Sequence, residues 1–368
     1  MSDNSKNMEL FYELVQVALG QRETLSRNPS DTEWDELFLL SQKQAVAGVA
    51  LIALDKLSQQ GQKPPVNLLL EWIGLSEQIK VQNQLLNKRC GEITKQFADA
   101  GFRTCILKGQ GNALMYSDPL SRNSGDIDLW VDGSRKEICD FVFSKCPDVE
   151  DGDMHIEAPF FKDVVVEVHY FPRYSNVPKY DKRLQVWFKE KSEAQFTNRV
   201  KLSPESAEYV CVPTVQFNAV QQMSHMMGHF FVEGIGLRQF IDYFYVLKKL
   251  NEENCSDNFE ELFEYLGMLK FARGVMWVEK EVLGLDDKYL LTSPDERLGK
   301  VILKEIEEGG NFGHHDKRYT VRNKGILMRG IVDSYRLLKL AYYFPEDALW
   351  KILRKIENQK WRLKNARN

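Results

Sequence analysis

The chain has 368 residues, which is long enough for two domains or for three small ones. Hydrophobic residues make up 43% and aromatic residues 11%, a composition that indicates a globular protein with packed cores. The formal net charge of -4 provides no overall basic field, so nucleic acid is a disfavoured partner, although it is not excluded.

The six cysteines are scattered and form no CxxC pair, which favours buried free thiols over a metal or disulfide framework. The first residues lack the basic start and the apolar stretch of a signal peptide. No segment reaches the roughly 18 uninterrupted apolar residues that a membrane span requires. We therefore expect a cytoplasmic protein with no membrane partner.

The predicted elements change in type along the chain. The first hundred residues repeat apolar residues at helical spacing, and the paired prolines of 61–67 interrupt this pattern. Strand patterns and helix patterns then alternate until about residue 200, and the rest of the chain is again helical. We predict an α+β fold with three parts: a helical N-terminal region (1–100), a small α/β catalytic unit (101–200) and a helical C-terminal domain (201–368).

Four strands are expected in the α/β unit. They lie at 103–109, 126–131, 155–161 and 164–171, and the last two read as a hairpin across Lys162-Asp163. Short helices are expected over 110–116 and 134–146.

The segment SRNSGDIDLWVDG places Asp126 and Asp128 two residues apart in an apolar strand. Successive side chains on a strand point to opposite faces, so the two carboxylates share a face, while Ile127, Leu129 and Val131 point into a core. Two adjacent carboxylates resist ionising together unless a cation offsets their charge. The pair therefore indicates a divalent metal, and Mg²⁺ bound in this way usually holds substrate phosphates as well.

The motifs LKGQGNALMY, RNSGDIDLWV and VVVEVHY together resemble the polymerase-beta-like nucleotidyltransferase superfamily. The closest resemblance is to a branch with an LKG turn, an arginine shortly before DIDL and an acid-x-His third strand. The helices before the turn, and the later His-rich helix followed by LRxxxD, are also similar to that branch. The resemblance implies a small, palm-like mixed sheet flanked by helices, and it implies a class of chemistry without a specific product.

The resemblance also assigns roles to individual residues. Asp126 and Asp128 match the Asp-x-Asp motif, and Glu167 matches the third carboxylate, where aspartate is the more common residue. These three acids would be both the catalytic residues and the ligands of two Mg²⁺ ions, with Mn²⁺ as an alternative. Gly109 matches the glycine turn against which a triphosphate packs, although Gln110 stands where the superfamily often has a second glycine or a serine.

Lys108 and Arg122 are candidate ligands for the triphosphate, with a surface charge or a salt bridge to the acids as the alternative. His169 lies two residues after Glu167 on the same face of its strand. It could orient the third acid or the acceptor, or simply form a hydrogen bond at the rim of the sheet.

Four polar residues in the C-terminal helices are candidates for the acceptor side of the site. His225 and His229 share a helix face at metal-ligand spacing, but no Glu follows His225 and no third ligand is evident, so structural hydrogen bonds are the alternative. Arg238 and Asp242 have the spacing of an ordinary ion pair within one helix. Because the short GIG link joins the two helices closely, all four could instead line one wall of the cleft.

The expected function is transfer of a nucleoside monophosphate from an NTP, with ATP favoured, to a hydroxyl-bearing acceptor. A small molecule is the first expectation for this acceptor, whose identity stays open. The alternatives are a toxin-type or modifying transferase that acts on tRNA or protein, and a catalytically silent module that binds nucleotide. His314 and His315, and the basic end of the chain from residue 351 on, receive no assigned role.

Overall fold

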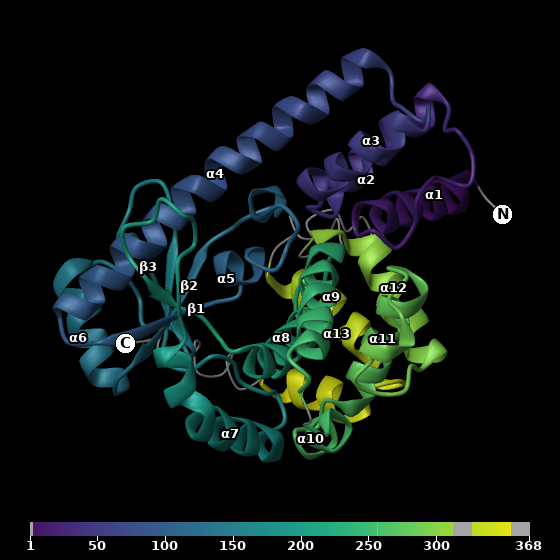
Figure 1. Cartoon of the computed structure of the whole chain (residues 1–368). Helices are drawn as coiled ribbons and strands as arrows, with labels where there is room; N and C mark the ends of the chain where they lie inside the picture. Colours follow the sequence, from purple (N-terminus) through teal and green to yellow (C-terminus); the bar gives the residue numbers. More distant parts are fainter. Residues whose placement is uncertain (1–2, 256, 312–325, 355–368) are drawn as a thin grey trace.

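The computed structural model describes residues 3–255, 257–311 and 326–354 of the chain. The pair His314 and His315 and the basic segment 355–368 lie outside these residues. Helices predominate at both ends of the described chain, and a small sheet lies between them (Figure 1). No helix among the described residues is both long enough and apolar enough to cross a membrane.

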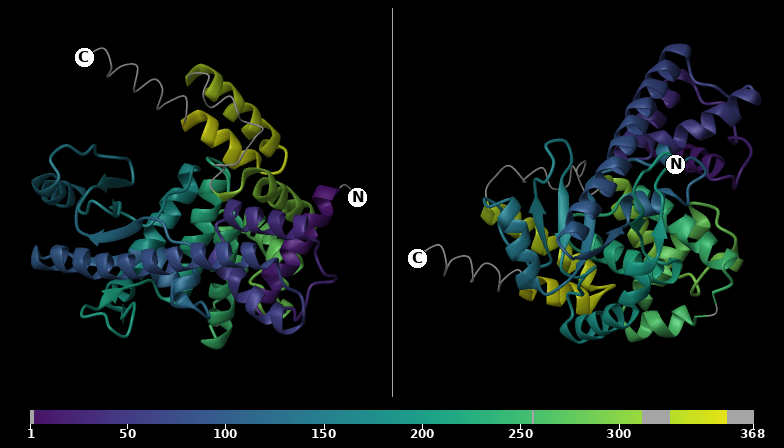
Figure 2. Two further views of the ribbon diagram at one scale, coloured as in Figure 1. Left: turned by 90° about the horizontal axis from the view of Figure 1, so that it is seen from above. Right: turned by 60° about the vertical axis from the view of Figure 1, so that its left-hand side comes forward.

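The N-terminal region consists of three short helices and one long one. The short helices are α1 (Asp3–Ala18), α2 (Asp31–Lys43) and α3 (Ala47–Gln59). Helix α2 begins with a capping box in which Ser30 and Glu33 bond to each other's backbone N–H groups. The long helix α4 (Val66–Asp99) starts directly after the paired prolines and has 34 residues, so it extends for about 50 Å. Figures 1 and 2 show it reaching from the N-terminal helices to the sheet.

The sheet has four strands in the order β1-β2-β4-β3. Strands β1 (Arg103–Leu107) and β2 (Ile127–Asp132) are antiparallel, β2 and β4 (Val166–His169) are parallel, and β3 (His155–Ala158) is antiparallel to β4. The predicted hairpin is therefore confirmed. Short helices α5 (Gly109–Ala113) and η1 (Pro119–Ser121) connect β1 to β2.

The two faces of this sheet have different surroundings. Ile127, Leu129 and Val131 point into a core that they share with the end of α4 and with α6 (Arg135–Lys145), as the alternation of the strand predicts. Trp130, on the other face, stacks on Phe217 of α8 (Val215–Phe230). One face of the sheet is thus closed by apolar side chains, and the other is turned toward the C-terminal helices.

The remaining elements complete the helical part of the molecule. Helix α7 (Pro178–Thr197) and the two-stranded pair β5 (Arg199–Val200) and β6 (Val210–Cys211) are additions to the predicted elements. The C-terminal helices are α9 (Leu237–Glu252), α10 (Phe259–Tyr265), α11 (Leu269–Glu281), η2 (Asp287–Tyr289), α12 (Glu296–Gly309) and α13 (Ile326–Ala341).

Apolar residues keep a helical spacing throughout 34–60 and 258–283, but each of these stretches contains a break. Residues 34–60 divide into α2 and α3 at Ala45, and residues 258–283 divide into α10 and α11 at Gly267. Both residues have positive φ angles, 55° and 75° respectively, which are incompatible with a continuing right-handed helix. Apolar periodicity alone does not reveal such breaks, because the apolar faces on both sides continue to pack on the same core.

Candidate active site

A cavity of about 570 Å³ lies between the polar face of the sheet and helices α8 and α9. This volume is typical of a site for a small ligand. Its lining combines acids, bases and imidazoles from the sheet and from both helices, and all eleven sequence-predicted site residues are part of it: Lys108, Gly109, Arg122, Asp126, Asp128, Glu167, His169, His225, His229, Arg238 and Asp242.

The three carboxylates of the predicted triad meet at the start of two neighbouring parallel strands. Asp128 on β2 is directly opposite Glu167 on β4 in the register of the sheet. Asp126 immediately precedes β2 and is exposed, whereas the Asp128 residue is only 4% exposed. Strand alternation and parallel pairing thus gather three acids at one end of the sheet.

The two aspartates have opposite electrostatic environments. The negative charge of Asp128 raises the pKa of Asp126 to about 6. Burial alone would also raise the pKa of Asp128, but Lys108 and a hydrogen bond with His169 lower it well below its usual range. At neutral pH Asp128 is therefore a stable anion, and the charge of Asp126 is the one that lacks compensation.

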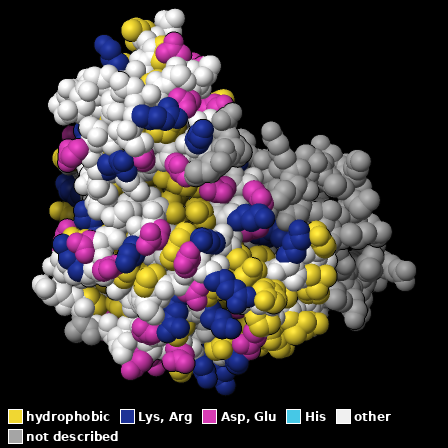
Figure 3. All heavy atoms as spheres, turned by 90° about the vertical axis from the view of Figure 1, so that its right-hand side faces the viewer, with side chains coloured by type: hydrophobic (Ala, Val, Ile, Leu, Met, Phe, Trp, Pro, Cys, Tyr) yellow, Lys and Arg dark blue, Asp and Glu magenta, His cyan; other side chains and the backbone are white. Residues whose placement is uncertain are grey.

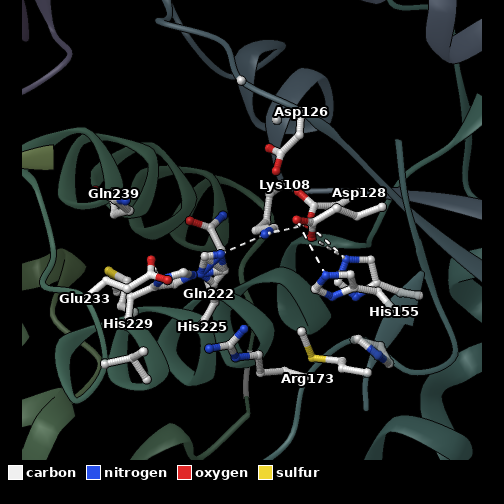
Figure 4. A pocket seen from close by; sticks show the side chains of 18 of the residues that line it. Lys108, Asp126, Asp128, His155, Arg173, Gln222, His225, His229, Glu233 and Gln239 are labelled. Carbon is white, nitrogen blue, oxygen red and sulfur yellow. Dashed lines mark hydrogen bonds and ion pairs between the residues drawn. The ribbon is translucent and has the colours of Figure 1, made fainter. Parts of the chain in front are cut away.

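Lys108 lies at the centre of the cavity. Its Nζ is 2.8 Å from Asp128 Oδ1 and 2.7 Å from His225 Nε2 (Figure 4). Its backbone φ is 53°, a left-handed value that non-glycine residues rarely adopt and that is concentrated at functional sites. The strained turn aims the lysine side chain at the acids, and Gly109, with φ 38°, continues it into α5.

The side chain of Gln110, which stands at the second position of the turn, points away from the cavity. It donates hydrogen bonds to the Asn87 side chain at 2.5 Å and to the Asn83 carbonyl at 3.4 Å, both on α4. Gln110 therefore attaches the turn to the long helix, and the glycine turn depends on its backbone for any contact with phosphate.

Two histidines of the hairpin complete the acid cluster. His169 Nε2 is 3.1 Å from Asp128 Oδ1 and 3.3 Å from Glu167 Oε2, and hydrogen bonds to both acids raise the pKa of this otherwise desolvated imidazole. His155 is opposite His169 in the register, and its Nε2 is 3.7 Å from Glu167 Oε1. Both imidazoles therefore turn Nε2 toward the third carboxylate.

The donor atoms of this cluster suit divalent cations. Carboxylate oxygens from Asp126, Asp128 and Glu167 are the ligands that Mg²⁺ and Mn²⁺ prefer, and a cation would relieve the repulsion that raises the pKa of Asp126. His155, Glu167 and His169 each offer a ligand atom within 4.8 Å of the others. Imidazole nitrogen is a ligand for transition metals more than for Mg²⁺, so a position beside Glu167 would favour Mn²⁺.

Arg122 and Asp242 form a buried ion pair between the loop before β2 and helix α9. Arg122 Nε and Nη2 each donate to one Asp242 oxygen at 2.7 Å, and the Tyr116 hydroxyl donates to Oδ1 at 2.6 Å. Arg238 Nη1 donates to the Asn123 carbonyl at 3.0 Å in the same loop. The helix spacing predicted that Asp242 would pair with Arg238, but its hydrogen-bonded partner is 120 residues away in the chain.

His225 and His229 both face the cavity from α8, and their ring centroids are 4.3 Å apart. Burial and the neighbouring Lys108 hold the pKa of His225 well below its usual range, so the neutral imidazole can accept a hydrogen bond from the lysine. Burial lowers the pKa of His229 to about 4, and its Nδ1 is 3.4 Å from Glu233 Oε2. His225 is thus bonded to Lys108, whereas His229 approaches Glu233 four residues further along the chain.

His155 and Arg173 are among the lining residues that were not anticipated from the sequence. His155 could have been found from the hairpin register, because a residue opposite His169 on the same face must lie beside Glu167. Arg173 lies in the irregular segment after β4, where no periodicity indicates the direction of a side chain. No sequence signal identifies it.

Comparison with known protein families gives a match. Residues 30–284, which include the sheet, α8 and α9, match the model of a family described as uncharacterised nucleotidyltransferase. Neither comparison with curated proteins nor comparison with solved structures gives a match. Because the family model covers more than half of the chain, this protein belongs to that family of nucleotidyltransferases and is an enzyme.

Proposed function

We propose that the protein is a Mg²⁺-dependent transferase that moves a nucleoside monophosphate from an NTP to a hydroxyl group of a small acceptor. The observation that carries the proposal is the pairing of Asp128 with Glu167 across two strands, with Asp126 beside them, in a cavity that also contains a strained glycine turn. Two cations held by these acids would stabilise the attacking and the leaving oxygens of an in-line displacement.

In the proposed reaction the acceptor oxygen forms a bond to the α-phosphorus of the NTP. The bond from that phosphorus to the bridging oxygen of the β-phosphate breaks, and pyrophosphate leaves with the electron pair. The acceptor proton passes to Glu167, which is the acid farthest from the glycine turn in strand order. The backbone of Lys108-Gly109 and the Lys108 ammonium contact the phosphates.

The size and the surroundings of the cavity favour a small acceptor. A volume of about 570 Å³ accommodates compact ligands better than a folded macromolecule. On the face shown in Figure 3, the described basic and acidic side chains are interspersed, so this face has no continuous basic surface of the kind that binds a nucleic-acid backbone.

The test uses ATP labelled in the α- or the γ-phosphate, Mg²⁺ and a mixture of hydroxyl-bearing metabolites. We expect label from the α-phosphate to enter a new product, label from the γ-phosphate to appear in pyrophosphate, and EDTA to stop both. Mn²⁺ in place of Mg²⁺ tests the metal preference, and the other NTPs test the base. Transfer of γ-label to the acceptor would identify a kinase and contradict the proposal, and label entering tRNA or protein alone would replace the small acceptor.

Replacing Gly109 with valine tests the phosphate turn separately. The φ of 38° strains any residue with a Cβ, and backbone that must approach phosphate closely has no room for a branched side chain. We expect weaker binding of a non-hydrolysable ATP analogue by calorimetry. Unchanged affinity in a folded Gly109→Val protein would place the triphosphate elsewhere.

A further inference from the structure

The guanidinium of Arg173 is a positive charge inside the cavity without an anionic partner in the described part of the chain. Its Nε is buried and forms no hydrogen bond with the described residues. The guanidinium carbon lies 5.7 Å from the ring centroid of Tyr174, a cation–π distance. Removing part of a charged group from water without a hydrogen-bond partner costs free energy, and a bound anion would offset this cost.

Helix α8 has a glycine at the position where the Arg173 side chain packs against it. Gly228 lies on α8 between His225 and His229, and a Cβ at this position would stand 2.2 Å from Arg173 Nη2 and 2.9 Å from Nε. Glycine in the interior of a helix is destabilising by about 1 kcal/mol relative to alanine. Here its absent side chain provides the space in which the guanidinium rests against the helix.

Arg173 and the glycine turn enter the cavity from different strands of the sheet. Lys108 and Gly109 follow β1, on one side of β2, whereas Arg173 follows β4, on the other side. In Figure 4 the guanidinium is turned toward the α8 histidines, with Lys108 between it and Asp126. An in-line displacement requires the acceptor and the pyrophosphate to lie on opposite sides of the α-phosphorus.

We propose that Arg173 binds an anionic group of the acceptor, so that the substrate is a hydroxyl compound that also carries a phosphate or a carboxylate. The proposal rests on the proposed function, and it deepens that function by naming the class of acceptor. Phosphate and carboxylate both match the planar donor set of a guanidinium. The neighbouring imidazole of His225 is neutral and adds no competing charge.

The test separates the acceptor anion from the triphosphate. Full-length protein is saturated with Mg²⁺ and a non-hydrolysable ATP analogue, and calorimetry then follows the addition of inorganic phosphate in one arm and of malonate in the other. We expect one of the two anions to bind beside the analogue, and the better one identifies the acceptor group. Arg173→Gln should reduce the affinity for that anion at least tenfold. The affinity for the analogue should stay within twofold of the parent value.

Gly228→Ala provides a second variant in which the guanidinium is retained but displaced. The substitution improves helix propensity, so the fold should be kept while anion binding falls at least tenfold. Gly74→Ala on α4, where an added Cβ would meet nothing within 4 Å, is the matched control and should bind the anion as the parent protein does.

The outcomes distinguish this proposal from the function on which it rests. The proposal is overturned if Arg173→Gln reduces the affinity for the analogue tenfold. It is also overturned if neither anion binds to the complex of the parent protein with the analogue. In both cases the proposed nucleotidyl transfer is unaffected. If the parent protein binds no analogue with Mg²⁺ at all, the proposed function fails, whatever the anions do. Anion binding that Gly228→Ala and Arg173→Gln leave unchanged also overturns the assignment of Arg173.

Discussion

Two arginines line the same cavity, and their charged groups have different surroundings. Arg122, only 5% exposed, has both ends of its guanidinium bound by Asp242, which also accepts a hydrogen bond from Tyr116. Arg173 has no carboxylate partner among the described residues, although Asp128 and Glu167 act on it through space. The first charge is satisfied by the fold itself, and the second remains available to a ligand.

The acids divide in the same way. The charges of Asp242 and Asp128 are balanced by cationic side chains of the protein. The pKa of Asp126 is raised, because the strongest charge that acts on it is that of another carboxylate, Asp128. Balanced pairs connect the loop before β2 to α9, and unbalanced charges surround the position of the proposed reaction. The comparison therefore predicts that substitutions at balanced positions change stability, while those at unbalanced positions change activity.

The largest effect is expected on catalysis at Asp128, which is balanced by Lys108 and also belongs to the proposed metal site. Asp128→Asn removes a metal-binding carboxylate, so Mg²⁺-dependent release of pyrophosphate from ATP should fall on the order of 10³-fold. Stability should not rise, because the substitution also removes the ion pair with Lys108 at 2.8 Å and the hydrogen bond with His169 at 3.1 Å. Thermal unfolding and steady-state kinetics measure both quantities, and unchanged turnover would make Asp128 structural.

The second effect concerns stability alone. Arg122→Met leaves Asp242 buried without its cation and should reduce the free energy of unfolding by about 3–5 kcal/mol, measured in urea. The triple variant Arg122→Met, Asp242→Leu, Tyr116→Phe removes every polar member and should recover most of this loss. Triple-variant protein that is stable but loses affinity for the ATP analogue would show that Arg122 also contacts nucleotide, as the sequence suggested.

The third effect is smaller and separates the two α8 histidines. His225→Ala removes the acceptor of the Lys108 hydrogen bond, so the lysine is held less well and kcat should fall about tenfold, which corresponds to about 1.4 kcal/mol. The KM for NTP should change little. His229→Ala is the matched control, since its Nδ1 lies near Glu233 and not near Lys108. Equal losses in both variants would contradict a role that depends on the lysine.

The predictable parts of the site are those in which the regular geometry of a strand fixes the direction of each side chain. The two-residue repeat of a strand places Asp126 and Asp128 on one face, and it does the same for Glu167 and His169. Parallel pairing of β2 with β4 then brings the two pairs of side chains together. The Arg122–Asp242 pair was missed because residues four apart on a helix are a sufficient local explanation for Arg238 and Asp242. Arg173 was missed because its direction depends on space left by Gly228, which lies on another element.

The helical fold was predictable in kind and less so in detail. Apolar spacing identifies α8 and α9 because each buries one face in the shared core. The breaks at Ala45 and Gly267, and helix α7 with its polar sequence, depend on tertiary packing that periodicity does not encode.

The smallest effect is a dependence of stability on pH that is specific to Asp126. Its pKa of about 6 in the folded protein is above the value of about 3.9 for an unfolded chain, so the folded state binds the proton more tightly. The contribution to stability is therefore fully present below about pH 4 and is lost as the pH rises through 6. Because the residue is exposed, solvent screening limits the loss to about 1 kcal/mol.

The measurement compares Asp126→Asn with the parent protein by thermal unfolding in EDTA between pH 4 and 8. Asparagine cannot ionise, so the variant should become the more stable of the two as the pH rises above 6, and the difference should disappear near pH 4. Added Mg²⁺ should restore the thermal stability of the parent protein and should not affect that of the variant. The reason is that the cation compensates the negative charge of Asp126, which no side chain balances beside Asp128. A variant that is less stable than the parent at pH 8 in EDTA would mean that Asp126 has a partner within the chain, and the contrast between balanced and unbalanced acids would then be lost.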